Sequence, residues 1–234
     1  LAQIFGVSLG LISLLAEGVF LLEGHFTLAG LLILLAIFLG IVIFGLIRRP
    51  WKFPKNYKYH LLIGLALFGL TIGWRLYQAR DLILPNWVDS QHHFLIVRVI
   101  LEQGGLPETL DPYLPVPFYY HHGFHAATAL FAVLSRLSIG EGMLVFGQIL
   151  NAAISLSVYT LGKSLWRDWR PAAAGALLVS FATRMPAYYL SWGRYTLTTG
   201  LILLPLAMGL ALRLLRKDRD KTESLTLGLL TAGV

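Results

Sequence analysis

Five of the seven histidines gather in one stretch of the sequence, close behind the carboxylate of Asp89. Asp89, His92 and His93 have the spacing i, i+3 and i+4, which places them on one face of a helix. His121 and His125 are also four residues apart. Imidazoles and carboxylates are ligands for divalent metals, and a carboxylate can also accept a proton during catalysis. The cluster therefore predicts a divalent metal site.

A purely structural role competes with this interpretation. Polar aromatic side chains also anchor helices where a membrane meets water, and an acid at a helix start can be no more than a cap. The spacing of His121 and His125 lacks the Glu that follows the first His in a metalloprotease helix. Both interpretations stay open on the residues alone.

The composition is that of a membrane protein. Charged residues make up 13% of the chain, hydrophobic residues make up 56%, and the mean hydropathy is +0.69. A soluble domain usually has about a quarter charged residues. The absence of cysteine excludes disulfides and thiolate metal sites. The pI near 9.8 reflects Lys and Arg in short loops between apolar runs, as orientation in a bilayer requires, so we expect no nucleic-acid partner.

The apolar runs predict an all-α, polytopic transmembrane helical bundle. A spanning helix needs about 20 mostly apolar residues. Five runs qualify directly: 1–22, 28–47, 61–77, 143–165 and 196–215. A sixth run, 171–190, is long enough only if Pro186 is tolerated as a kink, and a further span begins at Leu225. We expect one transmembrane domain over 1–234 that forms the N-terminal part of a longer chain.

The basic loops predict the topology. Five, three and five of the 19 Lys and Arg residues lie at 48–58, 163–170 and 213–221. Basic residues of short loops gather on the cytoplasmic side, so the chain should cross an even number of times between these loops. This parity holds only if the short apolar run 122–137 does not cross. The segment 78–141 is then a non-cytoplasmic loop.

Two amphipathic helices are expected in this external loop, between the third and fourth spans of the chain. They cover about 89–103 and 122–137, and we expect external juxtamembrane helices, the second of which is juxtamembrane or re-entrant on the non-cytoplasmic face. Gly104 and Gly105 end the first helix. Four prolines between residues 107 and 117 prevent regular helix in the connection.

The order of the motifs resembles the GT-C superfamily of membrane glycosyltransferases. They read Asp-Ser-Gln-His-His at 89–93, Glu-Gln-Gly-Gly-Leu-Pro at 102–107, Tyr-His-His-Gly-Phe-His-Ala at 120–126, Leu-Gly-Lys-Ser-Leu-Trp at 161–166 and Ser-Trp-Gly-Arg-Tyr at 191–195. The chain is similar in particular to dolichyl-phosphate-mannose–protein mannosyltransferases and to aminoarabinose transferases. Many relatives have Tyr-Pro-Pro where this chain has Tyr-His-His, and a second acid where it has Ser90.

This resemblance implies an inverting transfer of a sugar from a polyprenyl-phosphate donor to a hydroxyl acceptor on the non-cytoplasmic face. Asp89 matches the acid that acts as catalytic base or helps to hold a metal. Arg184, Arg194, Tyr195 and Tyr120 are the expected substrate-binding and phosphate-binding residues. A divalent metal is the one cofactor considered, with ligands drawn from a set of five side chains. The set is Asp89, His92, His93, His121 and His125.

The partners follow from the same resemblance. They are a polyprenyl-phosphate-linked sugar, the lipid bilayer and an acceptor that is a glycan, a lipid or a protein. We expect a multi-pass protein of the plasma (inner) membrane of a prokaryote. Two alternatives remain: a transporter or flippase-like module, and a protein that only binds lipid-linked sugars. The first would need charges or broken helices near the midplane, for which Glu17, Gln148 and Asn151 are the candidates.

Overall fold

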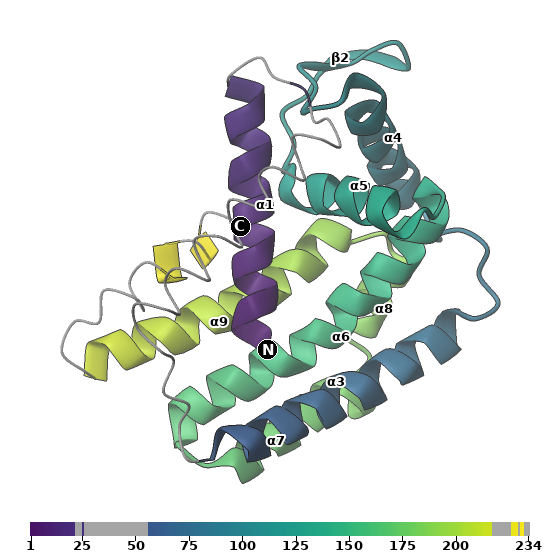
Figure 1. Ribbon diagram of the computed structural model, residues 1–234. Coiled ribbons are helices and arrows are strands. Elements are labelled where there is room, and N and C mark those ends of the chain that lie inside the picture. Colours follow the sequence, from purple (N-terminus) through teal and green to yellow (C-terminus); the bar gives the residue numbers. More distant parts are fainter. Residues whose placement is uncertain (22–24, 26–55, 217–225, 229, 232–234) are drawn as a thin grey trace.

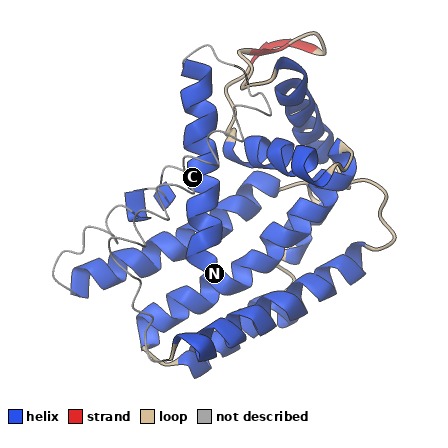
Figure 2. Ribbon diagram, viewed as in Figure 1, coloured by secondary structure: helices blue, strands red, loops and turns tan. Residues whose placement is uncertain are grey.

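The computed structural model is all-helical apart from one small hairpin, and it describes residues 1–21, 25, 56–216, 226–228, 230 and 231. Figure 1 shows long helices side by side and a smaller layer of α4, α5 and the hairpin across one end of them. Figure 2 shows how little of the chain is strand. The prediction of an all-α fold is confirmed.

Four helices of the described chain are long and apolar enough to cross a membrane. They are α1 (Ala2–Leu21), α3 (Tyr57–Ala79), α6 (Ile139–Trp166) and α9 (Tyr195–Arg216). These correspond to the spans predicted at 1–22, 61–77, 143–165 and 196–215. The spans predicted at 28–47 and from Leu225 onward lie outside the described residues or extend beyond them. The chain is therefore a multi-pass helical membrane protein.

Helix α6 is the centre of the bundle, because α3, α7 and α9 all pack against it. It begins with a capping box, in which the Ser138 side chain and the Glu141 side chain each bond the other residue's backbone N–H. Its buried face carries small residues, including Gly147, Ala152 and Ala153. Small residues let neighbouring helices approach closely in a membrane, where burial of apolar surface contributes little.

The sixth span predicted over 171–190 is not one continuous helix: the segment that returns from the end of α6 to the start of α9 is interrupted. Helix α7 (Trp169–Leu177) passes into a short π-helix, η1 (Leu178–Ala182), which ends before Pro186, and the brief helix α8 (Ala187–Ser191) follows. Proline has no N–H to donate and disfavours helical geometry at the residue before it. The backbone therefore breaks at 183–186, and neither piece has the length of a span.

The end layer comes from the segment predicted as the large loop. Helix α4 (Val88–Gln103) and helix α5 (Gly123–Ser135) are the two helices expected at about 89–103 and 122–137. Strands β1 (Thr109–Leu110) and β2 (Leu114–Pro117) form an antiparallel hairpin between them. Helix α5 has 13 residues, too few to cross a bilayer, and it packs against α1, α4 and α6.

The two ends of the bundle of long helices differ in their basic residues. Helices α1 and α3 end, and α6 and α9 begin, on the side of the bundle that α4 and α5 cover (Figure 1). The opposite side carries Lys163 in the last turn of α6, Arg167 and Arg170 just after this helix, and Arg213 in the last turn of α9. Arg216 joins these two basic ends, since its guanidinium donates to the Ser164 carbonyl over 2.6 Å. This arrangement has the parity that the basic loops required.

Single-cysteine labelling tests the orientation, because the sequence has no cysteine of its own. We expect Ser135→Cys, exposed at the end of α5, to react with a membrane-impermeant maleimide on intact cells or spheroplasts. Arg170→Cys, exposed near the start of α7, should react only after the membrane is opened. Equal reactivity of both cysteines from outside would contradict the topology.

Candidate functional site

The site forms where the first turn of α4 meets the segment that leads into α9. Gly193 has φ +67°, and a Cβ added there would lie 2.7 Å from the Ser90 nitrogen and 3.0 Å from the Asp89 Cβ. Only glycine allows both this backbone conformation and this close approach. The buried Tyr195 hydroxyl is hydrogen-bonded to the Ser90 side chain, which fixes the two segments to each other.

This contact brings two of the predicted site residues together. The Arg194 Nε lies 3.5 Å from the Asp89 Oδ2, with side-chain exposures of 56% and 37%. An ion pair this accessible contributes little to stability, about 1 kcal/mol or less. It keeps a carboxylate and a guanidinium in reach of a ligand at the end of the bundle that α4 and α5 cover.

Two histidines lie behind the Asp89–Arg194 pair as a buried, hydrogen-bonded couple. The His125 Nδ1 is 2.8 Å from the His121 carbonyl, which can only accept, so His125 Nδ1 carries the proton. The His125 Nε2 then accepts from the His93 Nδ1 over 2.8 Å. The ring of Phe124 stacks on that of Tyr195 at 5.0 Å, and both pack edge-on against His93.

Burial keeps both histidines neutral. It lowers the pKa of His93 to about 4, while the Gly193 backbone and the Asp89 carboxylate act in the opposite direction. Burial, followed by the neighbouring His93, also holds the pKa of His125 well below its ordinary value. A neutral imidazole can donate one hydrogen bond and accept another, so the two rings are linked to each other and to the backbone. This buried pair supports the first turn of α4.

The five side chains suggested as metal ligands do not converge. His93 and His125 bond each other, Asp89 pairs with Arg194, and His92 and His121 are exposed. In the part of the chain that the structure describes, no group of three or more His, Asp or Glu is placed to hold a metal ion. The metal stays a prediction from the resemblance, and the chemistry derived below does not pass through it.

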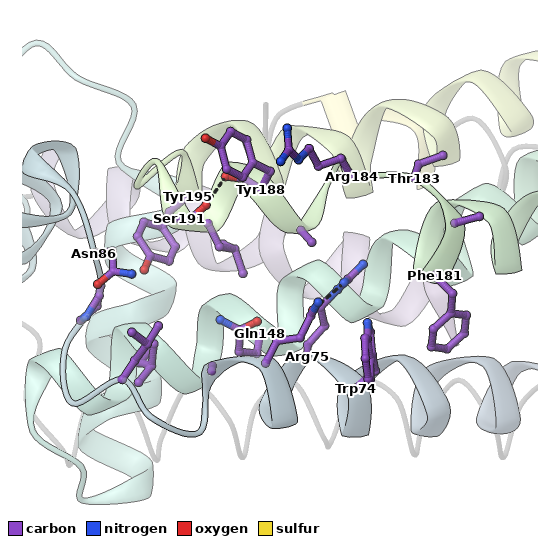
Figure 3. A pocket seen from close by; sticks show the side chains of 18 residues that line it. Trp74, Arg75, Asn86, Gln148, Phe181, Thr183, Arg184, Tyr188, Ser191 and Tyr195 are labelled. Atoms are coloured by element: carbon purple, nitrogen blue, oxygen red, sulfur yellow. Dashed lines mark hydrogen bonds between the residues drawn. The ribbon is translucent and has the colours of Figure 1, made fainter.

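A cavity of about 470 Å³ lies between α3, α6 and the broken segment before α8 (Figure 3). Arg75, Arg184 and Tyr195 are among its lining residues, as are Asn86 and Ser191 on the side of α4. None of the described residues that line it is acidic. The cavity is therefore electropositive and reaches the segment on which Arg194 is carried.

Arg75 is a functional candidate that sequence reasoning missed, because an arginine near the end of a span usually extends its side chain outward to water. It is only 3% exposed. Its three nitrogens donate to the Asn151 side chain at 2.7 Å, the Gln78 side chain at 2.8 Å and the Ser180 carbonyl at 2.7 Å. The signal in the sequence was the pairing of a charge inside one span with Asn151 inside another.

A second cavity, of about 650 Å³, lies on the other side of the start of α9. Tyr120 and His121 line it together with Thr196, and the Tyr120 hydroxyl is 3.5 Å from the Thr196 hydroxyl. His122, also in the lining, lies 3.7 Å from the Glu17 carboxylate of α1. Its aromatic and hydroxyl lining suits a polar, uncharged ligand such as a sugar.

Comparison with known proteins gives one match. A family model described as "Family of unknown function (DUF6541)" matches residues 6–234, nearly the whole chain. No curated protein and no solved structure matches.

Because the buried histidine pair is neutral, we expect the folded protein to lose stability in mild acid. Below pH 6.5 the unfolded chain binds a proton at His93 that the folded chain does not bind until about pH 4. Unfolding then takes up protons, so stability should fall as the pH drops through this window, by roughly 3 kcal/mol in all. Thermal unfolding in detergent between pH 7 and 4.5 measures the fall.

His93→Phe is the informative variant, since the new ring fits the surrounding aromatic side chains and cannot titrate. It should show a shallower decline in melting temperature with falling pH than the unmodified protein. His92→Gln, at the exposed neighbouring position, should keep the full decline. An undiminished pH dependence in His93→Phe would show that this residue does not cause it.

Proposed function

We propose that this chain, which belongs to the DUF6541 family, is a membrane glycosyltransferase that moves a sugar from a polyprenyl-phosphate donor to a hydroxyl acceptor. The observation that carries the proposal is the Asp89–Arg194 pair, held beside an electropositive cavity in a multi-pass helical bundle. A carboxylate and several guanidinium groups are what a transfer with a phosphate leaving group requires.

The reaction needs one proton acceptor and one site of positive charge. Asp89 takes the proton of the acceptor hydroxyl, and the acceptor oxygen bonds to the anomeric carbon as the bond to the donor phosphate breaks. The lipid phosphate leaves with the electron pair of that bond. A single displacement of this kind inverts the configuration of the sugar, which is the GT-C outcome that the motifs suggest.

The arginines take different parts in this proposal. Arg184 lines the cavity, and its guanidinium lies 5.2 Å from the Tyr188 ring, so it is available to a phosphate. Arg194 is paired with Asp89 and orients the carboxylate. Guanidinium forks suit phosphate oxygens because they can donate two parallel hydrogen bonds.

The two tyrosines also take different roles in this proposal. Tyr195 is 1% exposed and bonded to Ser90, so we assign it to positioning Asp89 rather than to binding the sugar. Tyr120 is exposed and lines the second cavity, where it suits an acceptor. The proposed site faces away from the cytoplasm, in the plasma membrane of a prokaryote.

A transporter or flippase-like function is the second candidate, and the broken segment at 183–186 favours it. Transporter sites often lie where a helix is interrupted beside polar side chains in the bundle. Here Asn151 donates to the Pro186 carbonyl over 3.0 Å, and Gln148 lines the cavity nearby. Movement of a labelled polyprenyl-phosphate sugar across liposomes, with no sugar transferred to any acceptor, would favour this function.

Replacing Asp89 by Asn tests the transfer. The amide keeps the shape of the carboxylate but cannot take a proton, so the rate should fall roughly 100-fold or more. The measurement is transfer of radiolabelled sugar from polyprenyl-phosphate mannose and polyprenyl-phosphate aminoarabinose to membrane acceptors by the reconstituted protein.

Glu102→Gln is the matched control, because it removes another exposed carboxylate of α4, one that pairs with Arg98 at 2.8 Å at the far end of the helix. It should leave transfer near the unmodified rate. Unchanged transfer by Asp89→Asn would remove Asp89 from the mechanism. Absence of transfer by the unmodified protein with every donor tested would count against the glycosyltransferase.

A further inference from the structure

We infer that the cavity between Arg75 and Arg184 binds the phosphate of an amphiphile whose hydrocarbon chain lies in an apolar groove along α3. The assignment of this amphiphile as the donor rests on the proposed function. The binding itself rests on the geometry of the cavity and the groove.

The first support is the charge of Arg75. A buried arginine is costly unless its charge is compensated. Arg75 has five N–H donors, and its three bonds go to the neutral oxygens of Asn151, Gln78 and Ser180. One N–H remains on each terminal nitrogen, and Arg75 lines the cavity. An anion in the cavity would accept these N–H groups and supply the missing negative charge.

The second support is the position of Arg184 across the cavity. Figure 3 shows Arg75 and Trp74 on α3 facing Arg184 and Tyr188 on the other wall. Two guanidinium groups on opposite walls, with no acid among the described lining residues, favour an anion with several oxygens. A phosphate mono- or diester has this chemistry.

The third support is the groove that continues from the cavity. It has a volume of about 520 Å³ and shares Trp74 and Phe181 with the cavity. Gly69 and Gly73, four residues apart on α3, form its floor, and a Cβ on either glycine would meet no atom within 4 Å. The missing side chains therefore leave a shallow apolar channel on a spanning helix.

The charged cavity and the apolar groove adjoin each other, and this identifies the class of ligand. Free phosphate would use the arginines and leave the groove unfilled, and an uncharged lipid would leave Arg75 uncompensated. A lipid phosphate uses both parts at once. In the proposed reaction this places the leaving phosphate in the cavity, with its chain directed along α3.

Binding measurements on the full chain in nanodiscs of uncharged lipid test the inference, with intrinsic fluorescence as the signal because Trp74 borders both parts. The probes are inorganic phosphate and farnesyl phosphate. We expect farnesyl phosphate to bind more tightly. Arg184→Gln, at an exposed position, should weaken both probes roughly tenfold or more. Arg80→Gln, an exposed arginine outside the cavity, is its control.

The groove has its own variant. A Cβ at Gly73 meets no atom within 4 Å, so Gly73→Leu places its side chain in the channel and favours the helix, and it should weaken farnesyl phosphate alone. Gly18→Leu on α1, where an added Cβ would also meet nothing within 4 Å, is the matched control. Equal loss of both probes with Gly73→Leu, or no loss at all, would overturn the placement of the chain.

The two proposals can fail separately. Asp89→Asn should abolish transfer and keep farnesyl phosphate binding, since Asp89 is not in the cavity lining. Binding without transfer by the unmodified protein would leave the lipid-phosphate site standing and remove the glycosyltransferase. No binding of either probe, or binding that Arg184→Gln leaves unchanged, would overturn the site whether or not transfer occurs.

Discussion

A charged side chain and free backbone groups cannot be left unpaired inside a bilayer, and this constraint shapes the centre of the molecule. Arg75 on α3 donates to the Ser180 carbonyl, and Asn151 on α6 donates to the Pro186 carbonyl. Both carbonyls belong to the segment in which α7 continues as the π-helix η1 and the chain is then interrupted before α8. The polar side chains of two spans thus satisfy the irregular backbone of a third segment, and the cavity lies beside the interruption of that segment.

The contact at Gly193 ties this membrane interior to the layer above it. The segment that holds Arg194 lies against the first turn of α4, and the Tyr195 hydroxyl bonds Ser90 beside Asp89. Behind them the neutral, buried His93 and His125 are hydrogen-bonded to each other and support this contact. The positions of Asp89 and Arg194 are therefore set by buried neighbours, while the two charged groups themselves remain accessible.

The sequence was informative where periodicity and charge act locally. The positions of α1, α3, α6 and α9, and the short length of α5, follow from apolar run lengths and from the parity of the basic loops. Asp89 and Arg194 were each expected in the site from the order of the motifs, and the structure places their side chains 3.5 Å apart. The burial of Arg75 was not predicted, because it depends on hydrogen bonds to residues more than 70 positions away in the chain. Pro186 was expected to kink a continuous span, whereas the chain is interrupted at 183–186.

The hairpin between α4 and α5 has a consequence for how such proteins can diversify. Strand β2 is exposed along its whole length, and β1 is its one partner among the residues that the structure describes. Lengthening a surface turn adds little closure entropy, and α5 on its far side does not cross the bilayer. Insertions there would enlarge the layer formed by α4, α5 and the hairpin. They would not change the side of the membrane on which any later helix begins or ends. The scaffold can thus carry new recognition elements on this face while the cavity between α3, α6 and α8 stays unchanged.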